Sequence, residues 1–420
     1  MKKKTYRFFS IHTLTGTLFV IAVSFLISQV AHTIDFFNPM ERAFKDFTLT
    51  DIVFQPNTDE HGQITRFNDK RVSDKIVLVN LGGAGVGREG LSAMLDRINA
   101  ESPAVVGIDA FFRKPGDPYA DSLLAESFRK TRKLVLVSKI DSLDQNDKFR
   151  HITRSYPLFS TRAHSGFANF ITGGDDGYLT TRRFSARETI GRQTEWCFAG
   201  KILSLYDAQK FEVLKSRKKQ TELINYSGNL DQFYRLDYTT VFDPAADLSI
   251  LKDKIVLIGF LGEPMGQPSL EDVFFTPMNQ EMAGRSVPDM YGITVHANIL
   301  SMMLGEYYIA QAPNWLDPLL AVFICMLNVS IFLFIGHKYR RSSQLLMRIT
   351  QLVQGTVLTG LLIYLLAVND VYVEFTVSLT LLFLCADLTE IYEGSVHGFI
   401  ERFEHRNLSN RRSSFNRKER

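Results

Sequence analysis

Residues 85–90 (GVGREG) carry a glycine pattern that binds dinucleotides in many proteins. The pattern is G-x-G-x-x-G, placed between an expected strand and an expected helix, and Asp109 ends the next expected strand. An acidic residue there would hold a ribose. The alternative is a glycine turn joining strand to helix, since glycines also stand at 82 and 83. We favour the turn and expect no cofactor, because this segment is predicted below to lie outside the cell, where nicotinamide cofactors are scarce.

Charged and hydroxyl side chains near the expected strand ends are the candidate ligand groups. They are Arg88, Asp109, Arg113, Asp272 and Thr276. Open α/β sheets bind ligands at the carboxyl ends of their strands, where such side chains meet. Asp109 and Asp272 could hold a cation or a sugar hydroxyl, and Arg88 an anion. The alternative for each residue is a structural role, capping a helix or tying loops together.

Patterns for catalysis are weak. The motif Gly-Gly-Asp-Asp at 173–176 is similar to a diguanylate cyclase signature, but a hairpin turn explains it better. The chain has no G-x-S-x-G, H-E-x-x-H, P-loop or C-x-x-C motif. The lone His296 opens an expected helix and fits a capping or backbone-bonding role. We expect no enzymatic activity, no catalytic residues and no metal site.

These candidate residues lie in a region where short apolar strands alternate with helices. Strands are expected at 76–81, 105–109, 133–138 and 254–260, and helices at 91–100, 121–130, 195–207 and 295–304. Residues 223–228 should return to the sheet, and 166–172 with 178–184 should form a hairpin. Alternation of this kind predicts parallel strands with helices on both faces. The fold class expected here is an α/β domain with a mostly parallel central sheet.

Four apolar segments flank this domain, at 11–31, 315–336, 349–368 and 371–388. About 20 helical residues cross a bilayer, so we expect an all-α membrane part of four transmembrane helices. The first could instead be a cleaved signal peptide, but no small-x-small cleavage site follows it. Lysine and arginine gather at 1–10, 337–348 and 390–420. The positive-inside rule therefore puts these three segments in the cytoplasm and residues 35–312 outside.

The composition agrees with a membrane protein that has one sizeable soluble domain. The 420 residues are 45% hydrophobic and 22% charged, with a net charge of +3, too small to argue for nucleic acid. Three cysteines exclude a disulfide scaffold. A bacterial cytoplasmic (inner) membrane is expected, with the large domain extracytoplasmic, in the periplasm if there is an outer membrane.

Between residues 35 and 310 the order of motifs resembles the CHASE domain of type 2, an extracellular sensor of bacterial receptors. The matching stretches are FKDF at 44–47, IVLVNL at 76–81 with Arg88, PAVVGIDAFF at 103–112, residues 121–125, LINYSG at 223–228, KIVLIG at 254–259, Asp272 with FTP at 275–277, and VHAN at 295–298. One expected membrane helix precedes them and three follow. The sequence departs from the family at Asn80 and the glycine loop, where members often carry an acidic run and a tryptophan-proline-tryptophan turn.

The resemblance implies sensing of a small molecule or an envelope component. Family members deliver their output through a cytoplasmic kinase or cyclase domain, but only a short basic tail follows the last expected span. We therefore expect a receptor subunit that relays ligand binding through its helices to a separate cytoplasmic enzyme or regulator. Its other expected partners are the lipid bilayer and a second copy of the chain. A non-sensing envelope scaffold and, more remotely, an external enzyme are the alternatives.

Overall fold

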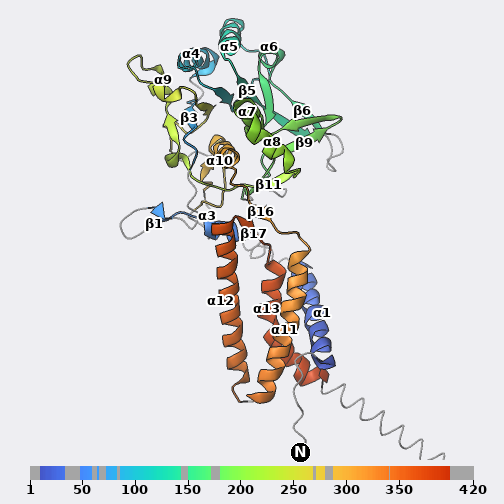
Figure 1. Ribbon diagram of the computed structural model, residues 1–420. Coiled ribbons are helices and arrows are strands. Elements are labelled where there is room, and N and C mark those ends of the chain that lie inside the picture. The colour runs from blue at the N-terminus through green and yellow to red at the C-terminus, as the bar shows by residue number, and fades with distance from the viewer. Residues whose placement is uncertain are drawn as a thin grey trace, which may run out of the picture. The chain divides into compact units, whose positions relative to one another are not determined.

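The computed structural model describes residues 10–33, 48–58, 64–65, 72–82, 86–142, 150–171, 180–267, 271–279, 287–339 and 341–397. The chain divides into two compact units (Figure 1). One comprises Asp46–Ile309, and the other joins Met1–Lys45 to Ala310–Arg420. We call them the α/β unit and the helical unit.

A seven-stranded, mostly parallel sheet forms the centre of the α/β unit, as predicted. Its strand order is β12 (Tyr234–Leu236), β3 (Ile76–Asn80), β13 (Ile255–Gly259), β4 (Val105–Ile108), β5 (Leu134–Ser142) and β6 (Arg150–Thr153), with β7 (His164–Phe167) also paired to β5. Among these pairs, only β5 with β6 is antiparallel. Every residue of β3, β4 and β13 is buried, which explains their continuous apolar sequences.

Helices cover both faces of the sheet. Helices α4 (Gly87–Ala100) and α5 (Pro118–Lys130) share one core with strand side chains such as Val79, Val106 and Ile258. The opposite face receives α7 (Phe198–Tyr206) and α10 (Gly292–Gly305). Gly107 permits the approach of α7, because a Cβ there would lie 2.7 Å from Ile202 Cδ1.

Shorter elements complete the α/β unit. They are α3 (Leu49–Phe54), β1 (Asn57–Thr58), β2 (Ile64–Thr65), α6 (Pro157–Ser160), β8 (Arg183–Ser185), β9 (Arg187–Ile190), β10 (Gln193–Trp196), α8 (Ala208–Ser216), β11 (Thr221–Leu223), α9 (Tyr238–Phe242), β14 (Val273–Phe274) and β15 (Met290–Tyr291), with 3₁₀ turns at Leu230–Gln232 and Ser249–Leu251.

Two local predictions differ from this structure. Residues 223–228 do not return to the main sheet: β11 pairs with β8, and the main sheet gains β12 instead. The helix expected from 195 starts at Phe198, since β10 takes residues 193–196. The turn of the expected hairpin, at 173–177, lies outside the described residues, but Ile171 pairs antiparallel with Arg183 beside it.

The helical unit contains three helices that are long and apolar enough to cross a membrane within the described chain: α1 (Ile11–Thr33), α11 (Leu316–Lys338) and α12 (Ser343–Asn369). The segment predicted as a fourth span, 371–388, is different. It begins with β17 (Val371–Tyr372), and its helix α13 (Thr376–Ile391) has 16 residues. This corrects the expectation of four long helices. A π-helical stretch, Tyr392–His397, continues the chain.

Polar contacts connect α13 to its neighbours at both of its ends. At its start, the Asp317 carboxylate accepts hydrogen bonds from Ser378 Oγ at 2.6 Å and Val377 N at 3.0 Å. Also near this end, β17 pairs with β16 (Ala310–Gln311). Towards its other end, the Asp387 carboxylate forms an ion pair with Arg348.

Candidate functional site

Asn80 organises the carboxyl edge of the central sheet. Its amide side chain is fully buried at the end of β3. Nδ2 donates to Asp237 Oδ1 at 3.0 Å and to the Gly262 carbonyl at 2.9 Å, while Oδ1 accepts from Leu261 N at 2.9 Å and Gly82 N at 3.2 Å. One side chain therefore joins the segments that follow three adjacent strands, β12, β3 and β13.

Asp109 and Asp272 form an acid pair at this edge. Asp109 follows β4, and its backbone N–H extends the ladder to the Ile258 carbonyl at 2.8 Å. Burial raises the pKa of Asp109 to about 8, and the negative charge of Asp272 raises it further. The pKa of Asp272 rises to about 6 through burial and the charge of Glu271. Asp272 thus ionises first, and its charge then keeps the proton on Asp109.

Asp272 also lies at the start of α10. The residue as a whole is exposed, but its carboxylate lies against Gly292, where an added Cβ would be only 2.8 Å from Oδ1. This close approach excludes water from one side of the carboxylate, and burial is the larger of the two causes that raise its pKa. The Asp272 carbonyl accepts a hydrogen bond from Gly292 N at 2.8 Å. A carboxylate at a helix N-terminus is stabilised by the helix dipole.

The other three predicted site residues have partners within the protein. Arg88 on α4 forms an ion pair with Asp121 of α5, and its Nη2 donates to the Lys114 carbonyl at 2.7 Å. Thr276 is fully buried and donates to Asp289 Oδ2 at 2.5 Å. Arg113 stacks over the Phe111 ring at 4.3 Å. The structure thus couples Asp109 with Asp272, while Arg88 and Thr276 connect elements to one another.

The glycine segment, for which a turn was favoured over dinucleotide binding, is only partly described. Residues 83–85 lie outside the described chain. Gly82 has a φ of 74°, which favours glycine, and a Cβ there would meet Tyr238 and Val86 within 3.0 Å. Gly82 therefore serves the turn between β3 and α4.

Buried side chains of α10 adjoin the site. Asn298 Oδ1 accepts from Ser227 N at 2.9 Å, and its Nδ2 donates to the Gly228 carbonyl at 2.7 Å. His296 was expected to cap the helix or bond to backbone, and this was wrong. Its ring lies between Phe170 and Phe198, and neither ring nitrogen has a hydrogen-bond partner in the described part of the chain. Burial lowers its pKa to about 3, so the ring is neutral.

Asn80 and Asp237 lie at this edge but were not among the ligand-binding residues predicted from the sequence. Asn80 is the last residue of β3, and Asp237 directly follows β12. For Asn80 this position was visible at the end of IVLVN, because a polar residue that closes a fully apolar strand of a parallel sheet lies at the carboxyl edge. Strand β12, which precedes Asp237, has no comparable apolar run.

One family model matches the chain, described as the CHASE2 domain, over residues 17–336. No curated protein and no solved structure matches it. The matched range contains all of the α/β unit and therefore the Asn80 network, the acid pair and α10. The chain belongs to the CHASE2 domain family, a family of extracellular sensor domains.

Proposed function

We propose that this protein is a membrane-bound sensor subunit of a bacterial cytoplasmic (inner) membrane. Its extracytoplasmic α/β unit binds a stimulus at the carboxyl edge of the sheet, and its helices pass the change to a separate cytoplasmic partner. The acid pair Asp109–Asp272 is the observation that carries this proposal. Two carboxylates that repel each other are stabilised when a proton, a cation or a hydroxyl donor binds to them. Binding of any of these would change the distance between the two carboxylates.

Helix α10 is the element that would carry this change. The backbone N–H of its first residue, Gly292, donates to the backbone carbonyl of Asp272. Every residue from Gly292 to Leu304 is buried. A buried helix shifts as a unit, because close-packed interiors do not deform continuously. After α10 the chain runs through residues 306–315 directly into α11. A ligand shifts such an equilibrium only by its different affinities for the two states.

Contacts inside the helical unit support a four-crossing arrangement. Strand β16, which leads into α11, pairs with β17, which precedes α13. At the other end of α13, Arg348 pairs with Asp387, and Thr15 Oγ1 of α1 lies 2.5 Å from Tyr392 Oη. Helix α13 therefore runs from the β16–β17 end of this unit to the end that holds the loop after α11. The start of α1 and the basic tail would then share the cytoplasmic side.

The relay is tested by crosslinking full-length protein in membranes and identifying the chains that co-purify. We expect a cytoplasmic kinase, cyclase or regulator with the wild type, and its loss when the residues after Phe403 are deleted. Asp109→Asn with Asp272→Asn should keep this partner but change the extent of crosslinking. Asp231→Asn is the matched control, since that carboxylate is 79% exposed and pairs with Arg235. Recovery of envelope proteins alone, unaffected by the tail deletion, would support a scaffold instead.

We further propose that the α/β unit acts by binding and not by catalysis. The acid pair has no adjacent nucleophile among the five predicted site residues, since Thr276 donates its hydroxyl proton to Asp289. A double Asp109→Ala, Asp272→Ala variant should lose signalling while the purified protein shows no turnover before or after the change. Measurable turnover that this variant abolishes would make the protein an enzyme.

A further inference from the structure

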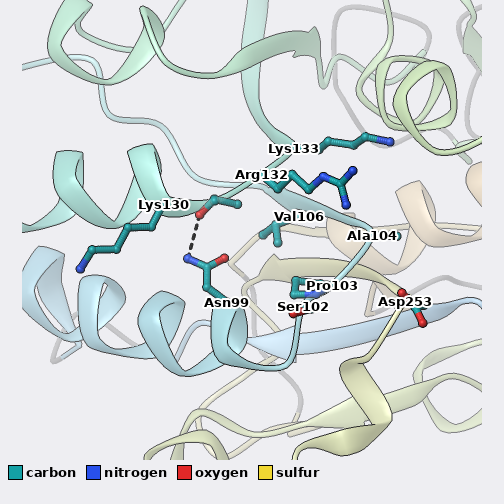
Figure 2. A pocket seen from close by; sticks show the side chains of 10 residues that line it. Asn99, Ser102, Pro103, Ala104, Val106, Lys130, Arg132, Lys133 and Asp253 are labelled. Atoms are coloured by element: carbon teal, nitrogen blue, oxygen red, sulfur yellow. Dashed lines mark hydrogen bonds between the residues drawn. The ribbon is translucent and has the colours of Figure 1, made fainter.

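A pocket of about 380 Å³ opens at the opposite, amino edge of the sheet. It lies where β4, β5 and β13 begin and where α4 and α5 end (Figure 2). This volume falls in the range of small-molecule sites. The pocket is distinct from the acid pair and does not depend on the function proposed above.

Hydrogen bonds fix the walls of this pocket. Asn99 Nδ2 at the end of α4 donates to Thr131 Oγ1 at the end of α5, at 3.0 Å (Figure 2). On the other wall, Asp253 N donates to the Ser102 carbonyl at 3.3 Å. Ala104 N donates to the Lys254 carbonyl at 2.8 Å. A site whose shape is already formed loses little entropy when a ligand binds.

Two opposite charges border the pocket without pairing. In the described part of the chain, neither Arg132 nor Asp253 makes a side-chain hydrogen bond or ion pair. Figure 2 shows the Arg132 guanidinium and the Asp253 carboxylate on either side of Ala104. The two lysines of the pocket differ, because Lys130 lies 3.7 Å from Asp96 and Lys133 Nζ donates to the Leu205 carbonyl at 2.5 Å.

The helix dipole explains the position of Arg132 but not that of Asp253. A cation such as Arg132 is favourable just after the C-terminus of α5, because of the helix dipole. The Asp253 carboxylate adds negative charge to a pocket beside which α4 and α5 both end, and the C-terminus of a helix carries partial negative charge. That combination stabilises a positively charged group placed between them. None of the pocket's cations is paired with Asp253.

We propose that this pocket binds a small zwitterion of the α-amino acid class. The ligand carboxylate pairs with Arg132, whose planar guanidinium suits bidentate binding. The ligand ammonium lies between Asp253 and the helix carbonyl ends. Val106, Ala104 and Pro103 give the pocket an apolar wall, which suits a short aliphatic side chain.

The test is calorimetric titration of the full-length protein in detergent with each common amino acid in turn. We expect saturable binding of one or more small aliphatic amino acids. The matching amide, which lacks the carboxylate, and the N-acetyl derivative, which lacks the ammonium, should each bind at least about tenfold more weakly. Arg132→Gln should weaken binding of the amino acid and abolish the difference in affinity between the amino acid and its amide. Asp253→Asn should abolish the difference in affinity between the amino acid and its N-acetyl derivative.

Arg129→Gln is the matched control, because Arg129 is an exposed α5 residue paired with Glu126 and does not line the pocket. This variant should bind like the wild type. Arg132 and Asp253 are both exposed, so their variants should fold, which circular dichroism would verify. Absence of saturable binding at millimolar concentrations overturns the proposal. Binding of inorganic phosphate that depends on Arg132 but not on Asp253 would show a simple anion site and overturn it as well.

Discussion

Asp109 and Asp272 hold protons in the folded protein at pH values where free carboxyls have lost them. The pKa of Asp109 rises from 3.8 to about 8. Between these values the folded state binds more protons than the unfolded state, so the free energy of unfolding falls as pH rises. Asp109→Asn removes the charge that must be desolvated. We expect its stabilising effect to grow with pH, from about 1 kcal/mol at pH 5 to a few kcal/mol at pH 8.

Thermal unfolding of the full-length protein across this pH range checks the sign. The same measurement on Asp231→Asn, an exposed carboxyl paired with Arg235, should give a curve parallel to that of the wild type. If Asp109→Asn destabilises the protein equally at pH 5 and pH 8, the carboxyl is already ionised in the folded state and the acid pair has no role in sensing protons or cations.

The substitution Asn80→Asp replaces the buried amide with a carboxyl group of nearly the same shape. Asn80→Asp loses both amide donors and brings a second negative charge to Asp237 Oδ1, now 3.0 Å from Nδ2. We expect a loss of about 3–5 kcal/mol at neutral pH, since a buried charge is left without a partner. The loss should shrink at acid pH, where the new carboxyl is protonated and can donate. Denaturant unfolding measures both, and Asn80→Ala is the control whose loss should not depend on pH.

Sequence alone identified the two acids but not their relation. A strand-ending aspartate is visible in VVGID, whereas the approach of Asp272 depends on the left-handed backbone at that residue and on the close contact with Gly292. Arg88 and Thr276 were the right residue types for ligands, yet their partners Asp121 and Asp289 satisfy them inside the fold. Pairing across distant segments has no sequence period, so it could not be predicted.

At the scale of elements, a buried ion pair anchors α3. Arg182 Nη2 donates to both carboxylate oxygens of Asp51, at 2.9 and 2.7 Å, and both side chains are nearly buried. Asp51→Asn should cost about 3 kcal/mol, because it removes a carboxylate that accepts two charge-assisted hydrogen bonds from the guanidinium. Combining it with Arg182→Met should recover part of that loss.

A double-mutant cycle on denaturant unfolding gives the coupling energy of this pair. Glu212→Gln is the contrast: its pair with Lys215 is exposed and should contribute less than about 1 kcal/mol. Additive losses from Asp51→Asn and Arg182→Met would mean that α3 is held by its apolar residues, such as Val53 and Phe54, and not by the ion pair.

Elements with a continuous apolar pattern were predictable, and short edge elements were not. Strands β3, β4 and β13 are buried on both faces, so their sequences carry the signal. Strand β12 has the sequence YRL with two exposed residues, and nothing local distinguishes it from a loop. Its parallel pairing with β3 comes from tertiary contacts, as does the pairing of β16 with β17.

At the scale of the whole molecule, the path of α13 decides on which side the tail lies. Its 16 residues span about 24 Å, less than a hydrocarbon core of about 30 Å. If only α1, α11 and α12 cross, the basic tail would lie on the outer side, against the positive-inside rule. If α13 also crosses, with Tyr392–His397 extending it, the tail returns to the cytoplasm. We expect the second arrangement.

Cysteine labelling separates the two arrangements, because the native Cys197, Cys325 and Cys385 are all buried and should not react. A membrane-impermeant maleimide should label Ser122→Cys, an exposed site on α5, in intact spheroplasts. It should label Ser342→Cys and Ser413→Cys only after permeabilisation. Labelling of Ser413→Cys from outside, with Ser342→Cys still protected, would show three crossings. The relay would then lose its cytoplasmic tail, and any partner would have to bind the loop between α11 and α12.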